Sequence, residues 1–158
     1  MLRRVKTKKH RSAGDSFAIV ASQYNARYVD AMLRAAKTEL QRAGVKKIEV
    51  IRVPGAFEIP VIAARLANDF SGPAFSAIIC LGVILRGETV HAAHIGEAVS
   101  RALMQIQLKY GIPVIHEVLL LENENQARAR CLDKKHNRGA EAAQTALQMA
   151  RLMKTLRV

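Results

Sequence analysis

The sequence is poor in aromatic residues, cysteine and acidic residues, and each shortage excludes a class of protein. Aromatic residues fill 4% of the 158 positions and tryptophan is absent, so the core must be built from Ala, Val, Ile and Leu. The two cysteines, Cys80 and Cys131, lie far apart and form no CxxC pair, which argues against a zinc site or a disulfide framework. No apolar run reaches the ~18–20 residues of a membrane span, and no signal-peptide-like stretch precedes Phe17. We therefore expect a cytoplasmic protein without a membrane segment.

The shortage of acidic residues leaves the chain with a net charge of +12. Six of the first eleven residues are Lys or Arg, and we interpret residues 1–14 as a basic N-terminal arm. A chain of this length is typical of one domain, so residues 15–158 are expected to form a single domain. Such charge attracts polyanions, including phosphorylated ligands, or is simply solvated. No helix-turn-helix, RNP or zinc-finger pattern accompanies it, so a nucleic-acid partner is not expected.

Short apolar runs alternate with longer segments of helical periodicity along the rest of the chain. Strands are expected over residues 17–21, 48–53, 75–81 and 114–121. Helices are expected between Asn25 and Gly44, over 59–66, from about 90 to 110, around Gln126, and over 139–153. Strands without a polar face are typical of parallel sheets covered by helices. The alternation predicts an α/β fold, a three-layer αβα sandwich with a central, mostly parallel four-stranded sheet, as in flavodoxin-like domains.

Ligands of such sheets bind beyond the carboxyl ends of the strands, and flat or polar side chains follow the first two expected strands. Tyr24 can stack on a flat heterocycle or pack at the domain edge. Asn25 can hydrogen-bond a ligand or cap the helix that follows it. Ala56 lets a ligand approach the main chain closely. Glu58 is a carboxylate between two apolar residues, Phe57 and Ile59. It can bind a hydroxyl or an amine of a ligand, or it can stabilise the start of a helix.

The segment 82–91, which follows the third expected strand, predicts an anion site. Its glycines precede the start of a helix, where free N–H groups and the helix dipole attract negative charge. Thr89 adds a hydroxyl donor, and His91 in the first helical turn can move protons for a bound phosphate ester. The GxxxxGK(S/T) pattern of a P-loop is missing. A metal held by Glu88, His91 and His94 is a weaker alternative, because no fourth ligand motif accompanies them.

A second basic stretch, residues 128–138, follows the fourth expected strand. Arg130 can clamp a phosphate with two parallel hydrogen bonds. We expect Glu141 to hold the guanidinium of Arg130, with Lys134 and Arg138 as supporting residues. The alternative interpretation is a basic helix that is only solvated.

Five segments, taken together, resemble the lumazine synthase family. They are, in family order, Tyr24-Asn25, residues 53–60, residues 81–91, Glu122-Asn123 with Gln126 and Arg130, and residues 137–143. They cover the chain from about Ser16 to its end. The resemblance implies a condensation of 5-amino-6-(D-ribitylamino)uracil with 3,4-dihydroxy-2-butanone 4-phosphate. The products would be 6,7-dimethyl-8-ribityllumazine, phosphate and water, in the penultimate step of riboflavin biosynthesis, with no metal or organic cofactor.

The resemblance also implies a role for each matching residue. His91 would be the proton shuttle for imine formation and phosphate loss. Tyr24 would stack on the pyrimidine ring, where the family usually has Phe or Trp. The residues implied in binding the pyrimidine and the ribityl chain are Tyr24, Asn25, Ala56, Phe57, Glu58, Val83, Ile84, Leu85 and His116. Those implied in binding the phosphate are Glu88, Thr89 and Arg130, supported by Lys134, Arg138 and Glu141.

Three positions depart from the family pattern. His116 stands where a Phe commonly covers the substrate from the neighbouring subunit. Residues 119–121 are all Leu, in place of small or Thr residues, and Ala92 replaces an aromatic residue after the catalytic His. These replacements bear on substrate affinity rather than on the identity of the site.

The resemblance further implies a homo-oligomer. Family members share active sites between the subunits of a pentamer, and many assemble twelve pentamers into an icosahedral 60-subunit shell. No insertion separates Arg130 from Gly139 relative to shell-forming members, so a shell is compatible with the sequence. Association with riboflavin synthase is a further partner in keeping with the resemblance. The alternative function is a non-catalytic lumazine- or flavin-binding shell protein of the same fold, which the replacement at His116 leaves open.

Overall fold

The computed structural model describes residue 12 and residues 14–69 and 74–156, so the predicted basic arm lies outside the described residues except at positions 12 and 14. The elements are β1 (Ser16–Ser22), α1 (Ala26–Arg42), β2 (Lys47–Val53), η1 (Ala56–Glu58), α2 (Ile59–Ala67), β3 (Ala77–Leu85), α3 (His91–Tyr110), β4 (Val114–Leu121), α4 (Glu124–Ala127), η2 (Arg128–Leu132) and α5 (Arg138–Thr155). No helix within the described ranges is long and apolar enough to cross a membrane.

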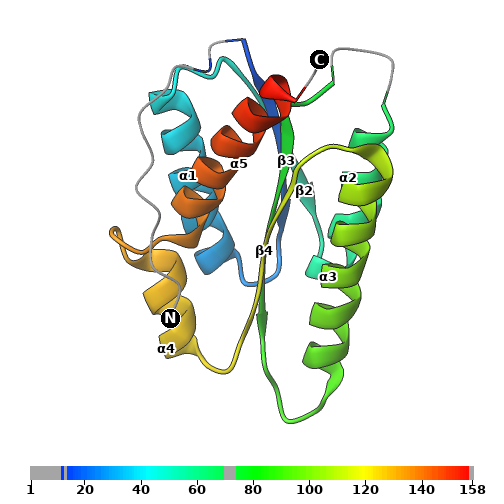
Figure 1. Ribbon diagram of the computed structural model, residues 1–158. Coiled ribbons are helices and arrows are strands. Elements are labelled where there is room, and N and C mark those ends of the chain that lie inside the picture. Colours follow the sequence, from blue (N-terminus) through cyan, green and yellow to red (C-terminus); the bar gives the residue numbers. More distant parts are fainter. Residues whose placement is uncertain (1–11, 13, 70–73, 157–158) are drawn as a thin grey trace.

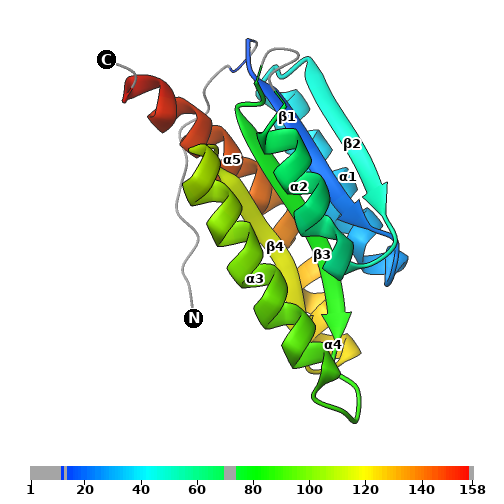
Figure 2. The same ribbon diagram turned by 90° about the vertical axis from the view of Figure 1, so that its right-hand side faces the viewer.

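The strands form one parallel sheet in the order β2-β1-β3-β4, with α1 and α5 on one face and α2 and α3 on the other (Figure 1, Figure 2). This arrangement confirms the predicted three-layer α/β sandwich. β1 and β3 lie inside the sheet and are almost entirely buried. Because successive side chains point to opposite faces of a strand, Phe17 and Ile19 pack with α1 and α5, whereas Ala18 and Val20 pack with α2 and α3.

β3 does not end where the sequence predicts. The sequence indicates a strand over residues 75–81, whereas the structure has it at Ala77–Leu85. Gly82, expected to open a loop, instead pairs with Val118 of β4, and the apolar residues after it keep the two strands in register to their ends. Only residues 86–90 therefore remain as the loop before α3.

The start of α5 lies directly against α1. Asn137 caps α5, because its side-chain oxygen accepts hydrogen bonds from the N–H groups of Gly139 at 2.9 Å and Ala140 at 3.4 Å. A β-carbon on Gly139 would overlap the carbonyl group of Met32 in α1. The two helices can approach this closely because glycine has no side chain. This contact between the helices fixes where α5 begins.

Candidate active site

The carboxyl ends of the parallel strands lie at one edge of the sheet, where four loops meet (Figure 2). Main-chain hydrogen bonds join the loops in pairs. The N–H of Tyr24, after β1, donates to the carbonyl of Pro54, after β2, at 3.0 Å. The N–H of Arg86, after β3, donates to the carbonyl of Leu121, at the end of β4, at 2.8 Å. This edge is where the sequence places most candidate ligand-binding residues.

Two aromatic side chains are exposed at the β1–β2 half of this edge. Tyr24 is 72% exposed and Phe57 is 61% exposed. The ring of Tyr24 lies over Gly55, where a β-carbon would come within 3.0 Å of the ring and 2.9 Å of a carboxylate oxygen of Glu58. Exposed rings bury much apolar area when a flat ligand covers them. This half of the edge therefore offers an aromatic surface beside a carboxylate.

The carboxylate of Glu58 is held by the main chain. Its Oε2 atom accepts a hydrogen bond from the N–H of Gly55 at 2.8 Å, across the short helix η1. No other group within the described ranges donates to this carboxylate. The helix-start role that the sequence allowed is thus present, and the second oxygen stays available to a ligand. Ala56, expected to admit a ligand to the main chain, is only 8% exposed and packs in the core with α2 and α3.

Asn25 joins β1 to β3 and does not cap α1 with its side chain. Its backbone is left-handed, with φ of 56°, a conformation that asparagine tolerates better than most residues. The side-chain amide donates to the carbonyl oxygen of Val83 at 2.8 Å instead of meeting the first N–H groups of the helix. The capping role that the sequence allowed is therefore wrong. Asn25 instead ties the turn after β1 to β3, whose last residues, Val83, Ile84 and Leu85, line this part of the edge.

The loop 86–90 is exposed throughout and is tied to the start of the segment after β4. The guanidinium nitrogen Nη1 of Arg86 lies 2.9 and 3.1 Å from the two carboxylate oxygens of Glu122. The main-chain N–H of Glu122 in turn donates to the side-chain oxygen of Gln126 at 3.0 Å. These contacts hold the loop in place while both Glu88 and Thr89 face solvent.

His91 is the first residue of α3 and is exposed. Its main-chain N–H lies 3.4 Å from the hydroxyl oxygen of Thr89, a long contact. The imidazole has no partner within the described ranges and is accessible to a ligand. No three His, Cys, Asp or Glu side chains of the described residues come close enough together to hold a metal ion, so Glu88, His91 and His94 do not form the cluster considered from the sequence.

Glu141 binds Arg138 and not Arg130, which corrects the expectation from the sequence. Nη1 of Arg138 donates to Glu141 at 2.6 Å, because the two residues lie three apart on α5. Nε and Nη2 of Arg138 donate to the two carboxylate oxygens of Glu117 at 3.0 and 2.7 Å. Arg130 and Lys134 are exposed and form no hydrogen bond or ion pair with any described residue. Arg138 is therefore held by two carboxylates, whereas Arg130 is available to an anion.

The sequence did not predict the role of Glu117, which holds Arg138. Glu117 lies in β4 and is 6% exposed. Burial raises the pKa of its carboxyl group to about 7, although Arg138 and, more weakly, Arg130 favour the charged form, while Glu141 opposes it. The available signal was the single acidic residue of β4, a strand whose other residues are apolar except His116. Cys131, a neighbour of Glu117, is buried, and burial raises the pKa of that thiol to about 11.

His116 points away from this cluster, on the opposite face of β4. Its Nε2 atom lies 2.8 Å from the hydroxyl oxygen of Ser100 in α3, and that hydroxyl donates to the carbonyl of Gly96 at 2.7 Å. Because the one hydroxyl proton is used in this way, the imidazole donates to Ser100. His116 is exposed on the edge strand, and β3 separates it from β1 and Tyr24.

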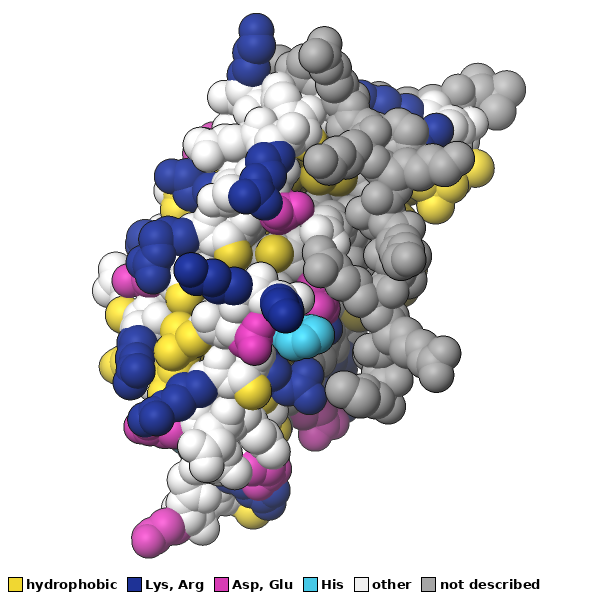
Figure 3. Space-filling model, turned by 90° about the vertical axis from the view of Figure 1, so that its left-hand side faces the viewer, with side chains coloured by type: hydrophobic (Ala, Val, Ile, Leu, Met, Phe, Trp, Pro, Cys, Tyr) yellow, Lys and Arg dark blue, Asp and Glu magenta, His cyan; other side chains and the backbone are white. Residues whose placement is uncertain are grey.

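The candidate residues of one chain do not converge on a single point. Figure 1 shows α4, which leads into η2 and Arg130, on the side of α1 and α5, whereas α3 with His91 covers the other face of the sheet. On the α1–α4 side, Lys and Arg side chains spread over the surface with acidic side chains between them (Figure 3). The basic stretch 128–138 is thus largely solvated, as the alternative interpretation held, with Arg138 as a half-buried exception.

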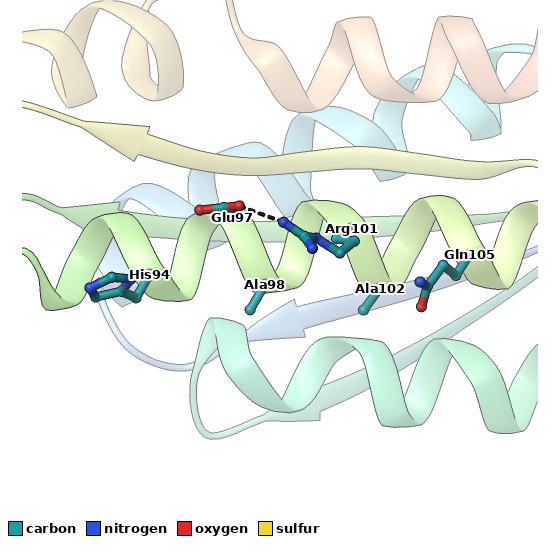
Figure 4. Close-up of a pocket in the computed structure, with 6 residues that line it drawn as sticks. All are labelled: His94, Glu97, Ala98, Arg101, Ala102 and Gln105. Carbon is teal, nitrogen blue, oxygen red and sulfur yellow. Dashed lines mark hydrogen bonds and ion pairs between the residues drawn. The ribbon is translucent and has the colours of Figure 1, made fainter.

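A surface hollow of about 410 Å³ lies elsewhere, along the exposed side of α3 (Figure 4). It is lined by His94, Glu97, Ala98, Arg101, Ala102 and Gln105. Glu97 and Arg101 form an ion pair across one helical turn at 2.5 Å. None of the residues implied in substrate binding lines this hollow, and it is open to solvent.

Comparison with known proteins assigns this architecture to a family. The model of the 6,7-dimethyl-8-ribityllumazine synthase family matches residues 14–154. The chain belongs to this family. A 6,7-dimethyl-8-ribityllumazine synthase of Stenotrophomonas maltophilia is 41% identical over 142 residues, which cover 89% of this chain and 90% of the relative. One from Xanthomonas oryzae pv. oryzae is 43% identical, and one from Xanthomonas campestris pv. campestris is 41% identical, each over the same shares of both chains.

Membership in the lumazine synthase family confirms the resemblance drawn from five sequence segments. All residues implied in substrate binding, from Tyr24 to Glu141, fall within the matched range. The first thirteen residues, which hold most of the basic arm, fall outside it. The family match therefore covers the sheet edge and its loops but not the first thirteen residues of the basic arm.

Proposed function

We propose that the chain condenses 5-amino-6-(D-ribitylamino)uracil with 3,4-dihydroxy-2-butanone 4-phosphate to give 6,7-dimethyl-8-ribityllumazine, phosphate and water, the penultimate step of riboflavin biosynthesis. The observation that carries the proposal is the family match over residues 14–154. Relatives named for this product, at 41–43% identity over 89% of the chain, support it. We place the reaction in the cytoplasm.

The pyrimidine binds at the β1–β2 half of the sheet edge. The exposed rings of Tyr24 and Phe57 offer the apolar faces on which a flat heterocycle stacks. The free oxygen of Glu58 accepts hydrogen bonds from ribityl hydroxyls, since its other oxygen is already held by the N–H of Gly55. Asn25 keeps the end of β3 beside the ligand, where the main chain of residues 83–85 contacts the pyrimidine.

The phosphate binds between the start of α3 and a free arginine. α3 is 20 residues long, so its N-terminal N–H groups and dipole favour an anion at residues 88–91. Thr89 adds a hydroxyl, and Arg130 supplies a positive charge that no described acidic side chain neutralises by direct contact. Both features attract the phosphorylated substrate and hold it at the same edge as the pyrimidine.

His91 moves the protons. The amine of the pyrimidine attacks the ketone of the second substrate, water leaves to form an imine, and phosphate is then lost after a proton is removed from the adjoining carbon. The ribityl-bearing nitrogen then attacks the remaining carbonyl carbon, and loss of a second water closes the ring. The imidazole of His91 can both accept and donate a proton, and it is exposed at the start of α3, where we place the phosphate. Holding two substrates side by side supplies much of the remaining acceleration.

A neighbouring copy of the chain completes the site. Because η2 with Arg130 and α3 with His91 lie toward opposite faces of the sheet, we infer that the phosphate at His91 of one chain meets Arg130 of a neighbouring copy. Exposed apolar side chains on α2 and α3, namely Val61, Met104 and Leu108, suit contact with another subunit. We propose a homopentamer, with His116 forming a polar wall of the neighbouring site, and a 60-subunit shell as its larger assembly.

The test is an absorbance assay with the purified full-length protein and both substrates. The proposal predicts lumazine formation above the uncatalysed background, and loss of this activity when His91 is replaced by Ala. If no product forms but a lumazine or a flavin binds tightly, the chain is a binding protein of the same fold, and the catalytic proposal is wrong.

A further inference from the structure

The buried carboxylate of Glu117 lies outside the substrate-binding edge described above. It holds Arg138, the first residue of α5, by two hydrogen bonds of 3.0 and 2.7 Å. Such a two-point contact fixes the plane and the direction of a guanidinium, which a single contact does not. With the third bond from Arg138 to Glu141, the start of α5 is anchored to β4.

The turn that carries Arg130 is attached to the same anchor. The side-chain amide of Asn137 donates to the carbonyl oxygen of Cys131, the residue after Arg130, at 2.5 Å. Asn137 and Arg138 are adjacent, and the cap made by Asn137 orients both relative to α5. The contacts therefore run without a break from Glu117 through Arg138 and Asn137 to the π-helical turn η2.

We propose that Glu117 is a positioning residue for the phosphate clamp, because its two-point ion pair with Arg138 fixes the start of α5 and, through Asn137, the turn that holds Arg130. The inference rests on the proposed function, since that function assigns the phosphate to Arg130. In this inference Glu117 contacts no substrate but fixes the position of the guanidinium of Arg130. Because Glu117 and Glu141 hold Arg138 with three hydrogen bonds, Arg130 is the cation of the two that no described carboxylate holds.

Two effects of removing the carboxylate of Glu117 have opposite signs. If the carboxylate acted through its charge alone, Glu117→Gln would make the site more positive, and phosphate would bind more tightly. If it positions the clamp, the side-chain amide introduced by this substitution cannot accept both bonds from Arg138, the turn loosens, and phosphate binds more weakly. Displacement of a binding group by about 1 Å costs up to about a hundredfold in rate, so a partial loosening predicts about a tenfold loss.

The experiment compares the wild type with Glu117→Gln, Arg138→Gln and the double variant at about pH 8, above the pKa of Glu117. The double variant removes the ion pair without changing the net charge. We expect all three to raise the KM for the phosphorylated substrate, and the Kd for inorganic phosphate measured by calorimetry, by about tenfold. The effects should not add, because both residues act through one contact. The KM for the pyrimidine should change less than about twofold.

A control removes an ion pair that makes no contact with α5. Glu97 and Arg101 on α3 lie 2.5 Å apart, and their double replacement by Gln also leaves the net charge unchanged. It should leave both KM values and the phosphate Kd unchanged. If Glu117→Gln does not fold, Glu117→Asp keeps the charge but is too short to meet both nitrogens of Arg138, and it should weaken phosphate binding in the same direction.

The outcomes separate this inference from the proposed function. Tighter or unchanged phosphate binding in Glu117→Gln, or an equal rise of both KM values as in general loosening of the fold, overturns the positioning role. If Arg130→Gln weakens phosphate binding while the Glu117 variants do not, the inference fails and the clamp stands. If Arg130→Gln leaves phosphate binding unchanged, the clamp itself is wrong, and the proposed site falls with it.

Discussion

Gly139 at the start of α5 lies so close to Met32 of α1 that a β-carbon on the glycine would overlap the carbonyl group of Met32. The carbonyl belongs to the main chain of a helix and cannot turn aside, so any side chain must push the two helices apart. The same residue follows the cap Asn137 and the anchored Arg138. Packing of one helix pair, and with it the proposed placement of the phosphate clamp, therefore depends on one glycine.

We expect Gly139→Ala to destabilise the protein. Overpacking of a core contact costs about 1–3 kcal/mol. We expect a loss of stability near the upper end of this range, because the atoms that the new β-carbon would meet belong to the main chain of Met32. Thermal and urea unfolding should show the loss. Gly14→Ala is a suitable control, because no atom lies within 4 Å of its β-carbon position, and its stability should stay close to that of the wild type. Equal stability of the two variants would contradict the close contact of α1 and α5.

His91→Ala should lower kcat by about a hundredfold or more, since a positioned acid–base group contributes roughly 10²–10⁴ in rate. The KM values should change little, because the imidazole moves protons and does not carry the binding. His94→Ala, one turn further along α3, is the matched control and should retain near-normal kcat. A similar loss in both variants would show that the start of α3, and not the imidazole of His91, is what the reaction requires.

Arg130→Ala should raise the KM for the phosphorylated substrate by about tenfold or more, because hydrogen bonds between charged groups contribute about 1.5–3 kcal/mol. The KM for the pyrimidine should stay the same, since we place that substrate at the β1–β2 half of the edge. Arg151→Ala, an exposed arginine near the far end of α5, removes the same charge away from the site. Steady-state kinetics with each substrate varied in turn separates a local loss from a general effect of charge.

The sheet could be predicted because its strands are short apolar runs separated by helical periodicity. β4 has the predicted bounds, β1 is one residue longer than predicted at each end, and β2 begins one residue earlier. The end of β3 could not be predicted, because a glycine after an apolar run is equally typical of a turn. Gly82 stays in the strand owing to its pairing with Val118, a contact between residues distant in the sequence.

The site could be predicted where a residue acts alone, and less well where residues pair. Tyr24 and His91 stand exposed at the expected edge, as their places after β1 and before α3 indicated. The pairing of Glu141 was wrong although its signal was local, since Arg138 lies three residues before it on one helix. Glu117 was missed because its partner is distant in the sequence, and only folding brings β4 under the start of α5.

The titration of Glu117 should appear in the pH dependence of stability. Burial raises the pKa of its carboxyl group from 4.5 to about 7, against the opposing charges of Arg138 and Arg130 and with the help of Glu141. The neighbouring Cys131, with its pKa raised to about 11, stays protonated throughout this range. The native state therefore binds the proton of Glu117 more tightly than the unfolded chain does. Protonation favours the native state, and this contribution to stability is lost as the pH rises from about 4.5 to about 7.

The Glu117→Gln variant has no such proton to lose. The broken ion pair changes the free energy of unfolding of the variant relative to the wild type. This difference between the two proteins should change with pH in one direction. Between about pH 4.5 and 7 the variant should gain on the wild type by up to about 3 kcal/mol, and the difference should be flat above about pH 8. Urea unfolding of both proteins at closely spaced pH values measures this difference directly. A constant difference over the whole range would mean that Glu117 titrates as it does in the unfolded chain, and that Arg138 offsets the entire cost of its burial.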